Sequence, residues 1–394
     1  MKNRREYALL LGLVLICFCM RSPMSPVGPL VSQIKSSLGL STSFAGLLTT
    51  IPMLIFAIVS PAAGKLLGKI SERALVSVCL FLVFLGVLIR SYLNVLGLII
   101  GTTLLGLGIG VLNVLIPVFI RTNFPQKIGI VMGTYTTSMT LLSALSAGFC
   151  VMLSAALGGW SNALAVFAIF PVLALPVWLI ESKYSCTERM HTEGMALKET
   201  AKQGKNWYAA LFMALQSALF FCMIAWLPSM MIENGAEASS IGYLVLLMQL
   251  TSLLTSFLMP ILIQRYPTRR GLLAVFCGIV YAAGFTMLLC GSLPVWLRVC
   301  SVVLLGLGSG LSLGFALTLI TILGKTQRET AGLSAFAQGV GYLFAAPMPV
   351  LLGAIYDCSG GFYLPTLILL IMCIPMAVVG QRAVSAKAVY LDAY

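Results

Sequence analysis

The chain has 394 residues, of which 60% are hydrophobic and 9% are charged. Soluble globular domains carry about 25% charged and about 45–50% apolar residues, so this composition excludes a soluble protein and favours one that crosses a membrane many times. The formal net charge of +13 does not indicate a nucleic-acid partner, because the Lys and Arg residues are scattered between apolar runs and form no basic helix or arm.

Apolar stretches long enough to cross a membrane recur twelve times along the chain. A spanning helix needs roughly 20 apolar residues to cross a hydrocarbon core of about 30 Å. The predicted fold class is therefore an all-α membrane protein with twelve transmembrane helices. The predicted spans cover residues 7–31, 43–66, 74–92, 95–120, 128–154, 163–181, 207–232, 239–263, 271–290, 295–323, 331–355 and 362–381.

One long polar break divides these spans into two groups of six. We expect an N-terminal six-helix half over residues 1–181, a linker over residues 182–206, and a C-terminal six-helix half over residues 207–394. The mixed charges of the break are typical of a solvated linker with a short surface helix.

The distribution of positive charge predicts the orientation of the chain. If the N-terminus is cytoplasmic, the inner segments carry twenty of the 24 Lys and Arg residues, and the outer segments carry Lys35, Arg90 and Arg298. Cytoplasmic loops of membrane proteins carry such an excess of Lys and Arg. Both termini and the linker are therefore predicted to be cytoplasmic.

The two halves repeat one another. The glycines of Gly106–Gly110 recur 200 residues later in Gly306–Gly310, and Pro61 recurs at nearly the same offset as Pro260. The glycine runs are predicted to be close-packing helix faces, because no strand precedes them as it would in a dinucleotide-binding loop. Parallel repeats of this kind favour a transporter with a substrate path between its halves.

Arg21 is the single charge that we place deep within a span, about 14 residues or roughly 20 Å from its start. Pro23, Pro26 and Pro29 follow it, and each removes an amide donor. Irregular backbone at membrane depth is tolerated only where it is buried in protein or lines a cavity. We therefore expect an interrupted helix beside a buried guanidinium, whose fixed donors suit a carboxylate or similar anion. The alternative is an arginine that backbone carbonyls satisfy, without a ligand.

Neutral polar side chains within the spans are the remaining candidates for a site. Each either contacts a substrate or forms an interhelical hydrogen bond. Gln338 and Tyr342 share a helix face because they are four residues apart. Trp226, toward the outer end of the seventh span, belongs either to an interfacial belt or to a cavity wall. The polar candidates are Asn113, Tyr135, Ser138, Gln216, Gln249, Gln338 and Tyr342.

The chain offers no set of residues typical of an enzyme or a metal site. His191, the only histidine, lies in the linker, which excludes Ser/His/Asp and Cys/His arrangements. Most cysteines lie inside apolar runs and lack zinc-site spacing. Gly324-Lys325-Thr326 ends like a phosphate-binding loop, but Leu319 stands where its first glycine must be. We expect no enzymatic activity, no cofactor and no metal.

The arrangement of twelve spans as two parallel sixes resembles the major facilitator superfamily. The loop from Gly64 to Arg73 resembles the glycine-and-charge signature of that superfamily, with Gly68 in place of the usual aspartate. The resemblance implies a gating or structural role for Gly64, Gly68 and Arg73. We assign the same kind of role to the three prolines after Arg21.

A closer resemblance covers nearly the whole chain and is to the cyanate/nitroimidazole transporter family, nearer its nitroimidazole branch. Asn113 and the stretch from Gln338 to Tyr342 point to that branch. The resemblance implies a multi-pass protein of the bacterial inner membrane that transports small, partly anionic or nitro-aromatic solutes. The matching stretches are residues 21–30, 46–52, 89–91, 108–117, 225–228 and 337–342.

We therefore predict a secondary transporter that works by alternating access as a monomer in the lipid bilayer. Its substrate is a small planar or anionic organic molecule, bound at the bilayer midplane between residues 1–181 and 207–394. Arg21 supplies charge and Trp226 an apolar wall. The residues expected to orient the solute by hydrogen bonds are Asn113, Tyr135, Gln249, Gln338 and Tyr342.

The energy source stays open, and so do two alternative functions. All eleven carboxylates lie in loops or at helix ends, whereas proton-coupled carriers commonly use acidic groups or His within the spans. Either a proton travels with the substrate, or a terminal group such as Glu181, Glu233 or Asp357 carries it, or the protein is a uniporter. The alternative functions are a multidrug efflux carrier of the same superfamily and a membrane receptor or scaffold that transports nothing.

Overall fold

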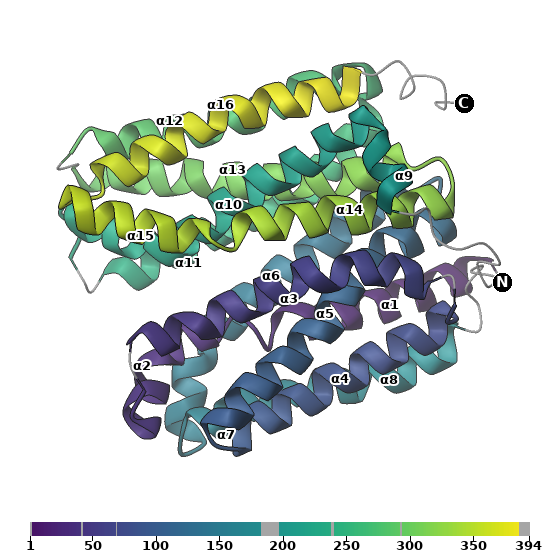
Figure 1. The fold of residues 1–394 in the computed structure, drawn as a ribbon, viewed down its shortest axis with the longest axis horizontal. Coiled ribbons are helices and arrows are strands. Elements are labelled where there is room, and N and C mark those ends of the chain that lie inside the picture. Colours follow the sequence, from purple (N-terminus) through teal and green to yellow (C-terminus); the bar gives the residue numbers. More distant parts are fainter. Residues whose placement is uncertain are drawn as a thin grey trace. The chain divides into compact units, whose positions relative to one another are not determined.

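A computed structural model describes residues 2–40, 42–67, 69–182, 197–237, 240–291 and 294–385. These residues are almost entirely helical, and no strand occurs among them (Figure 1). The prediction of an all-α protein is therefore confirmed. His191 and most of the linker lie outside the described residues, apart from the expected short helix, α9 (Leu197–Lys202).

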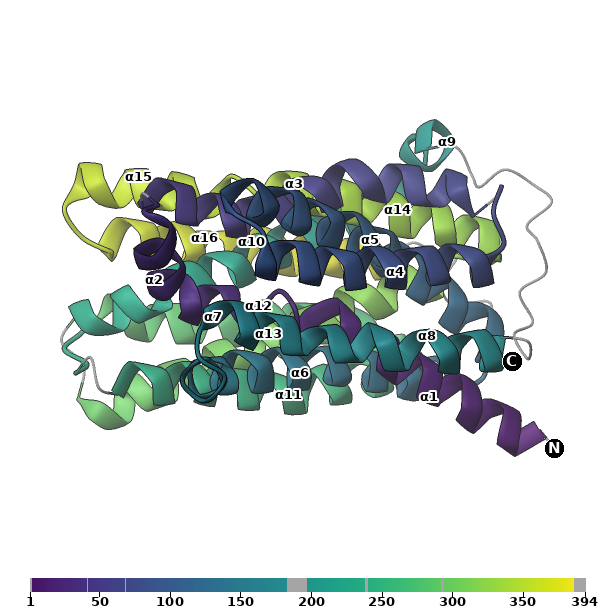
Figure 2. The same ribbon diagram turned by 90° about the horizontal axis from the view of Figure 1, so that it is seen from below.

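Each of the twelve predicted spans contains a helix or a helix pair. Within the described residues, ten helices are long and apolar enough to cross a membrane, and they match the third to twelfth predicted spans. The first span is a pair, α1 (Lys2–Arg21) and α2 (Val27–Leu38), and the second is α3 (Thr42–Leu66). The structure therefore supports a multi-pass membrane protein, with the first span interrupted (Figure 2).

The chain divides into two compact units. The first comprises residues 1–126, 138–197 and 324–335, and the second comprises the remainder. Beyond α1 to α3, the first unit contains α4 (Glu72–Tyr92), α5 (Val95–Asn123), most of α6 (Ile128–Ala156), α7 (Trp160–Ala165) and α8 (Ile169–Glu181). The second contains α10 (Gly204–Glu233), α11 (Ile241–Arg265), α12 (Arg270–Leu289), α13 (Val295–Leu323), most of α14 (Gln327–Ala345), α15 (Met348–Ser359) and α16 (Tyr363–Ser385).

Glycine faces pack the helices closely, as the sequence repeat predicts. In the first unit, a Cβ atom built on Gly108 of α5 would lie 2.7 Å from the carbonyl oxygen of Cys79 in α4. In the second unit, a Cβ atom built on Gly308 of α13 would lie 2.8 Å from the ring of Tyr281 in α12. Only hydrogen fits at such distances, so both glycine runs are confirmed as close-packing faces.

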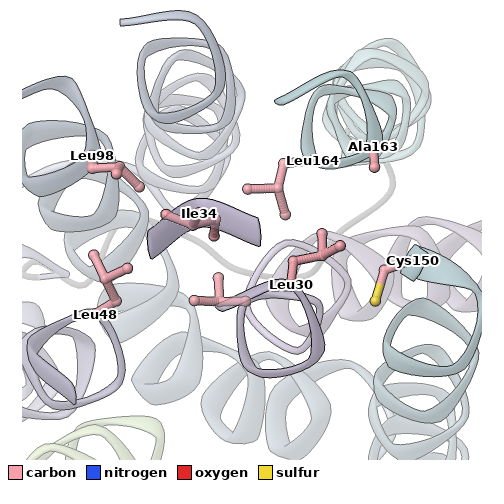
Figure 3. Packing of buried hydrophobic residues seen from close by; sticks show 8 residues of the cluster. Leu30, Ile34, Leu48, Leu98, Cys150, Ala163 and Leu164 are labelled. Carbon is pink, nitrogen blue, oxygen red and sulfur yellow. The ribbon is translucent and has the colours of Figure 1, made fainter. Parts of the chain in front are cut away.

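An apolar cluster in the first unit holds α2 in place. Leu30 and Ile34 of α2 are fully buried against side chains of α3, α5, α6 and α7 (Figure 3). These partners are Leu48, Leu98, Cys150, Ala163 and Leu164. Close packing of side chains holds helices together in a membrane protein, so the second part of the first span packs on four other helices although the span is interrupted.

Helices α6 and α14 are each divided between the units. The first turns of α6 pack on α11 in the second unit, where the amide of Gly129 donates to Gln264 Oε1 at 2.6 Å and Thr136 Oγ1 donates to the carbonyl of Ser256 at 2.7 Å. The first turns of α14 belong to the first unit, where Ser334 Oγ donates to the carbonyl of Val114 in α5 at 3.2 Å. In each of these helices, one end therefore packs in the first unit and the other end packs in the second unit.

Candidate functional site

The interruption of the first span is a tight turn between Arg21 and Val27. The amides of Met24 and Ser25 both donate to the carbonyl of Arg21, at 3.1 and 3.2 Å. Pro23 and Pro26 have no amide hydrogen and so cannot donate the backbone hydrogen bonds that would continue the helix. This explains why α1 ends here. Pro29 lies in the first turn of α2, where a missing amide hydrogen costs little. The predicted interruption is confirmed.

Arg21 is the last residue of α1 and is partly exposed. Among the described residues, no hydrogen bond or ion pair involves its guanidinium group. Guanidinium stays protonated in proteins and carries five donors. Within the described part of the chain, the arrangement therefore leaves a cation with free donors at the interruption of a membrane helix, while its role toward a ligand stays a prediction.

Arg90 is a second buried charge. We expected it among the outer-segment charges, and nothing in the structure contradicts that placement near the end of its span, but the sequence did not reveal how completely the protein buries it. Arg90 lies in the last turn of α4 and is only 1% exposed, more buried than Arg21. Its Nη2 donates to the carbonyl of Pro23 at 2.7 Å. The available signal was its position inside the predicted span 74–92, before the span's last residues.

A second side chain fixes the same turn from another helix. Ser25 Oγ lies 2.7 Å from Ser143 Oγ of α6, within the first unit, and the two hydroxyls share a hydrogen bond. Serines are common in membrane helices, so nothing in the sequence distinguishes Ser143 from its neighbours. The turn after Arg21 is thus held by α4 through Arg90 and by α6 through Ser143.

The other predicted polar residues are buried, but they do not all belong to one unit. Asn113 lies in α5 of the first unit with Arg21. Tyr135, Gln249, Gln338 and Tyr342 belong to the second unit. Whether all of them form one site stays a prediction.

Within the second unit, the Gln338–Tyr342 face of α14 contacts α10. The ring of Tyr342 lies 6.5 Å from that of Phe221, and a Cβ atom built on Gly341 would lie 2.9 Å from Met213 Cγ. Gln216, a further candidate on α10, donates from Nε2 to Ser217 Oγ at 2.8 Å. Packing of α10 on α14 therefore places Tyr342 beside Phe221, and whether Gln216 and Gln338 belong to the same site stays a prediction.

Trp226 supports a second helix interruption. Its indole Nε1 donates to the carbonyl of Pro349 at 2.8 Å, in the first turn of α15 just after α14 ends. Its ring lies 5.7 Å from that of Phe362 and closely faces Gly353. Arg90 and Trp226 therefore act alike, because each donates to a proline carbonyl where a membrane helix is broken.

The predicted gating residues have packing contacts inside the first unit. A Cβ atom built on Gly64 would lie 3.3 Å from the Cβ of Ala335, near the middle of α14. Arg73 Nη2 donates to the carbonyl of Leu179 at 2.8 Å, and the indole of Trp178 donates to the carbonyl of Arg73 at 3.1 Å. Gly68 lies outside the described residues.

One candidate proton carrier has a structural partner. Glu233 Oε1 accepts a hydrogen bond at 2.8 Å from the amide of Phe362, just before α16. It thereby satisfies an amide at the start of that helix, which has no partner within the helix. Among the residues that the structure describes, no group of three metal-binding side chains occurs.

Comparison with known proteins gives a consistent family assignment. The profile of the Major Facilitator Superfamily matches residues 10–346. The chain is 34% identical to the uncharacterized transporter YycB of Bacillus subtilis, over 97% of this chain and 94% of that protein. It is 31% identical to the 2-nitroimidazole transporter of Escherichia coli, over 97% of each. It is also 31% identical to the cyanate transport protein CynX of the same organism, over 90% and 91%.

Solved structures show the same fold. The proton:xylose symporter XylE matches with a TM-score of 0.77 and 14% identity, over 96% of this chain and 95% of that one. The transporter FucP in its outward conformation matches with a TM-score of 0.75 and 13% identity, over 95% and 98%. At these identities the likeness concerns the fold alone.

Proposed function

Because the chain belongs to the Major Facilitator Superfamily, and within it to the family of the 2-nitroimidazole and cyanate transporters, we propose that it carries a small planar or anionic organic solute across the bacterial inner membrane. The relatives' substrates support a solute of the 2-nitroimidazole or cyanate kind. The protein acts as a monomer with both termini in the cytoplasm.

The observation that carries the proposal is the guanidinium of Arg21 at the interrupted first span, which has no partner among the described residues. A cation in a membrane protein is costly unless it has a partner, and the described residues provide none for Arg21. A bound anion or an electron-rich nitro group supplies that partner. The buried amides and hydroxyls of Asn113, Tyr135, Gln249, Gln338 and Tyr342 orient the solute, and Trp226 provides apolar surface.

The division of α6 and α14 between the two units supports alternating access. Alternating access is largely a rocking or gating of one half of a transporter against the other around a fixed site, and helices whose two ends pack in different units suit such a change. In α6, the first turns pack on α11, whereas Ser143 and Cys150 pack within the first unit. The few hydrogen bonds at the α6–α11 contact can break and re-form without disrupting the helices.

A positive site also argues against the alternative of a multidrug exporter for cations. Arg21 would repel a cationic drug, and a like charge at close range costs binding energy. We expect the proton, if one is carried, to travel with the substrate, because Glu233 already serves as a helix cap.

The test is counterflow of labelled 2-nitroimidazole in proteoliposomes, which reports exchange whatever the direction of net transport. Wild type, Arg21→Gln and Arg21→Lys are compared, with cyanate as competitor and monodispersity in detergent as the folding control. A hydrogen bond to a charged group contributes about 1.5–3 kcal/mol, so Arg21→Gln should weaken substrate affinity roughly 10- to 150-fold. Wild-type affinity in Arg21→Gln refutes the site, and the absence of saturable exchange in wild type refutes the substrate class.

A further inference from the structure

Arg90 is a buried cation whose task the transport proposal does not use. We infer that Arg90 is a positioning residue: it fixes the interrupted segment of the first span and thereby sets the affinity of Arg21 for an anionic substrate. This inference rests on the proposed function, since it concerns the same site.

Burial explains why Arg90 needs a partner and what that partner is. The residue is 1% exposed, and a buried charge is tolerated only when it is paired or hydrogen-bonded. Within the described residues, no carboxylate contacts it and its Nε has no hydrogen-bond partner. The carbonyl of Pro23, at 2.7 Å from Nη2, is its one recorded acceptor. The two groups therefore depend on each other.

Close contact with α5 fixes the backbone of Arg90, so its side chain extends toward Pro23 from a fixed position. A Cβ atom built on Gly101 of α5 would lie 2.5 Å from Arg90 N and 2.7 Å from Arg90 Cβ. A Cβ atom built on Gly86, one turn earlier in α4, would lie 2.8 Å from the carbonyl oxygen of Gly101. The backbones of α4 and α5 are thus in direct contact where Arg90 begins.

The acceptor lies inside the turn that Arg21 closes. The carbonyl of Arg21 accepts the amides of Met24 and Ser25, and Pro23 lies between Arg21 and these donors. Ser25 is tied to Ser143 on the other side of the turn. A shift of Pro23 therefore moves the residue from which the Arg21 guanidinium extends, and small displacements of a charged ligand group reduce binding sharply.

Arg90 is not itself a substrate ligand in this scheme, because its 1% exposure leaves no access for a solute. For the positioning of Pro23, the shape of the Arg90 head group matters more than its charge. A lysine carries the same charge but lacks the planar, multi-donor head of arginine, so Arg90→Lys separates positioning from electrostatics. Ser143→Ala removes the hydrogen bond between Ser143 and Ser25, which also holds the turn, without any change of charge.

The experiment compares an anionic with an uncharged ligand in proteoliposomes. Cyanate and N-methylated 2-nitroimidazole are each measured as substrate or competitor for wild type, Arg90→Lys, Ser143→Ala and Arg21→Gln. Arg298→Lys is the matched control, since Arg298 is a partly buried arginine in a helix of the other unit. We expect Arg90→Lys to raise the KM for cyanate about tenfold, with maximal rate and uncharged-ligand affinity changed less than twofold. Ser143→Ala should show the same selectivity with a smaller loss, and Arg298→Lys neither effect.

The outcomes separate this inference from the transport proposal. If Arg21→Gln loses cyanate affinity while Arg90→Lys and Ser143→Ala keep it, the positioning role is overturned and the proposed site stands. If Arg90→Lys weakens both ligands equally, the role is structural and the inference is likewise overturned. If Arg21→Gln retains wild-type affinity, the proposed site fails, and the inference fails with it. If Arg90→Lys does not yield monodisperse protein, Ser143→Ala tests the inference instead: loss of cyanate affinity with unchanged affinity for the uncharged ligand supports it, and unchanged cyanate affinity overturns it.

Discussion

Gly101→Ala tests the close contact between α4 and α5 that supports Arg90. The added methyl group would lie 2.5 Å from Arg90 N, 2.6 Å from the carbonyl oxygen of Gly86 and 2.7 Å from Arg90 Cβ. None of these atoms can move by a rotamer change, so the two helices must separate. Overpacking of a well-packed interior costs about 1–3 kcal/mol, and this site belongs at the upper end because its neighbours are backbone atoms. Replacing glycine in a helix regains about 1 kcal/mol.

The net expected cost of Gly101→Ala is therefore about 2 kcal/mol of folding free energy. Thermal unfolding of the detergent-solubilised protein, followed by the loss of the monodisperse peak, should show a midpoint several degrees lower. Gly148→Ala is the matched control, because Gly148 also lies within a helix but an added Cβ meets nothing within 4 Å. If Gly101→Ala is as stable as Gly148→Ala, the backbone contact beneath Arg90 is not as tight as we describe.

Two further substitutions test interactions away from the interrupted span. Gln264→Leu removes the acceptor of a first-turn amide in α6 and should cost about 0.5–1.5 kcal/mol of stability; an unchanged unfolding midpoint would contradict this. Glu233→Gln keeps an Oε1 acceptor for the amide of Phe362, so transport and its response to an imposed pH gradient should match wild type. Loss of gradient-driven accumulation in Glu233→Gln would instead make Glu233 a proton carrier.

Much of the fold follows from local properties of the sequence. Hydrophobic stretches of the right length predict membrane helices because the bilayer acts on each segment separately. The glycine runs 106–110 and 306–310 predict tight packing because only glycine admits a neighbouring backbone so closely. The proline run predicts the break after Arg21 because a missing amide hydrogen is a property of the residue itself. The glycine faces and the break after Arg21 are confirmed in the structure, and ten of the twelve predicted spans match described helices that are long and apolar enough to cross a membrane.

The site was less predictable, because the roles of charged and polar residues depend on distant neighbours. The sequence alone identified Arg21 beside an interrupted helix. The tertiary structure decided that Arg90 is the more deeply buried cation, since its acceptor Pro23 lies 67 positions away. It also decided that Trp226 donates to Pro349, 123 positions away. Hydropathy and spacing describe how a residue relates to the membrane and to its own helix. Which carbonyl a buried donor reaches is fixed only when helices from distant parts of the chain pack together.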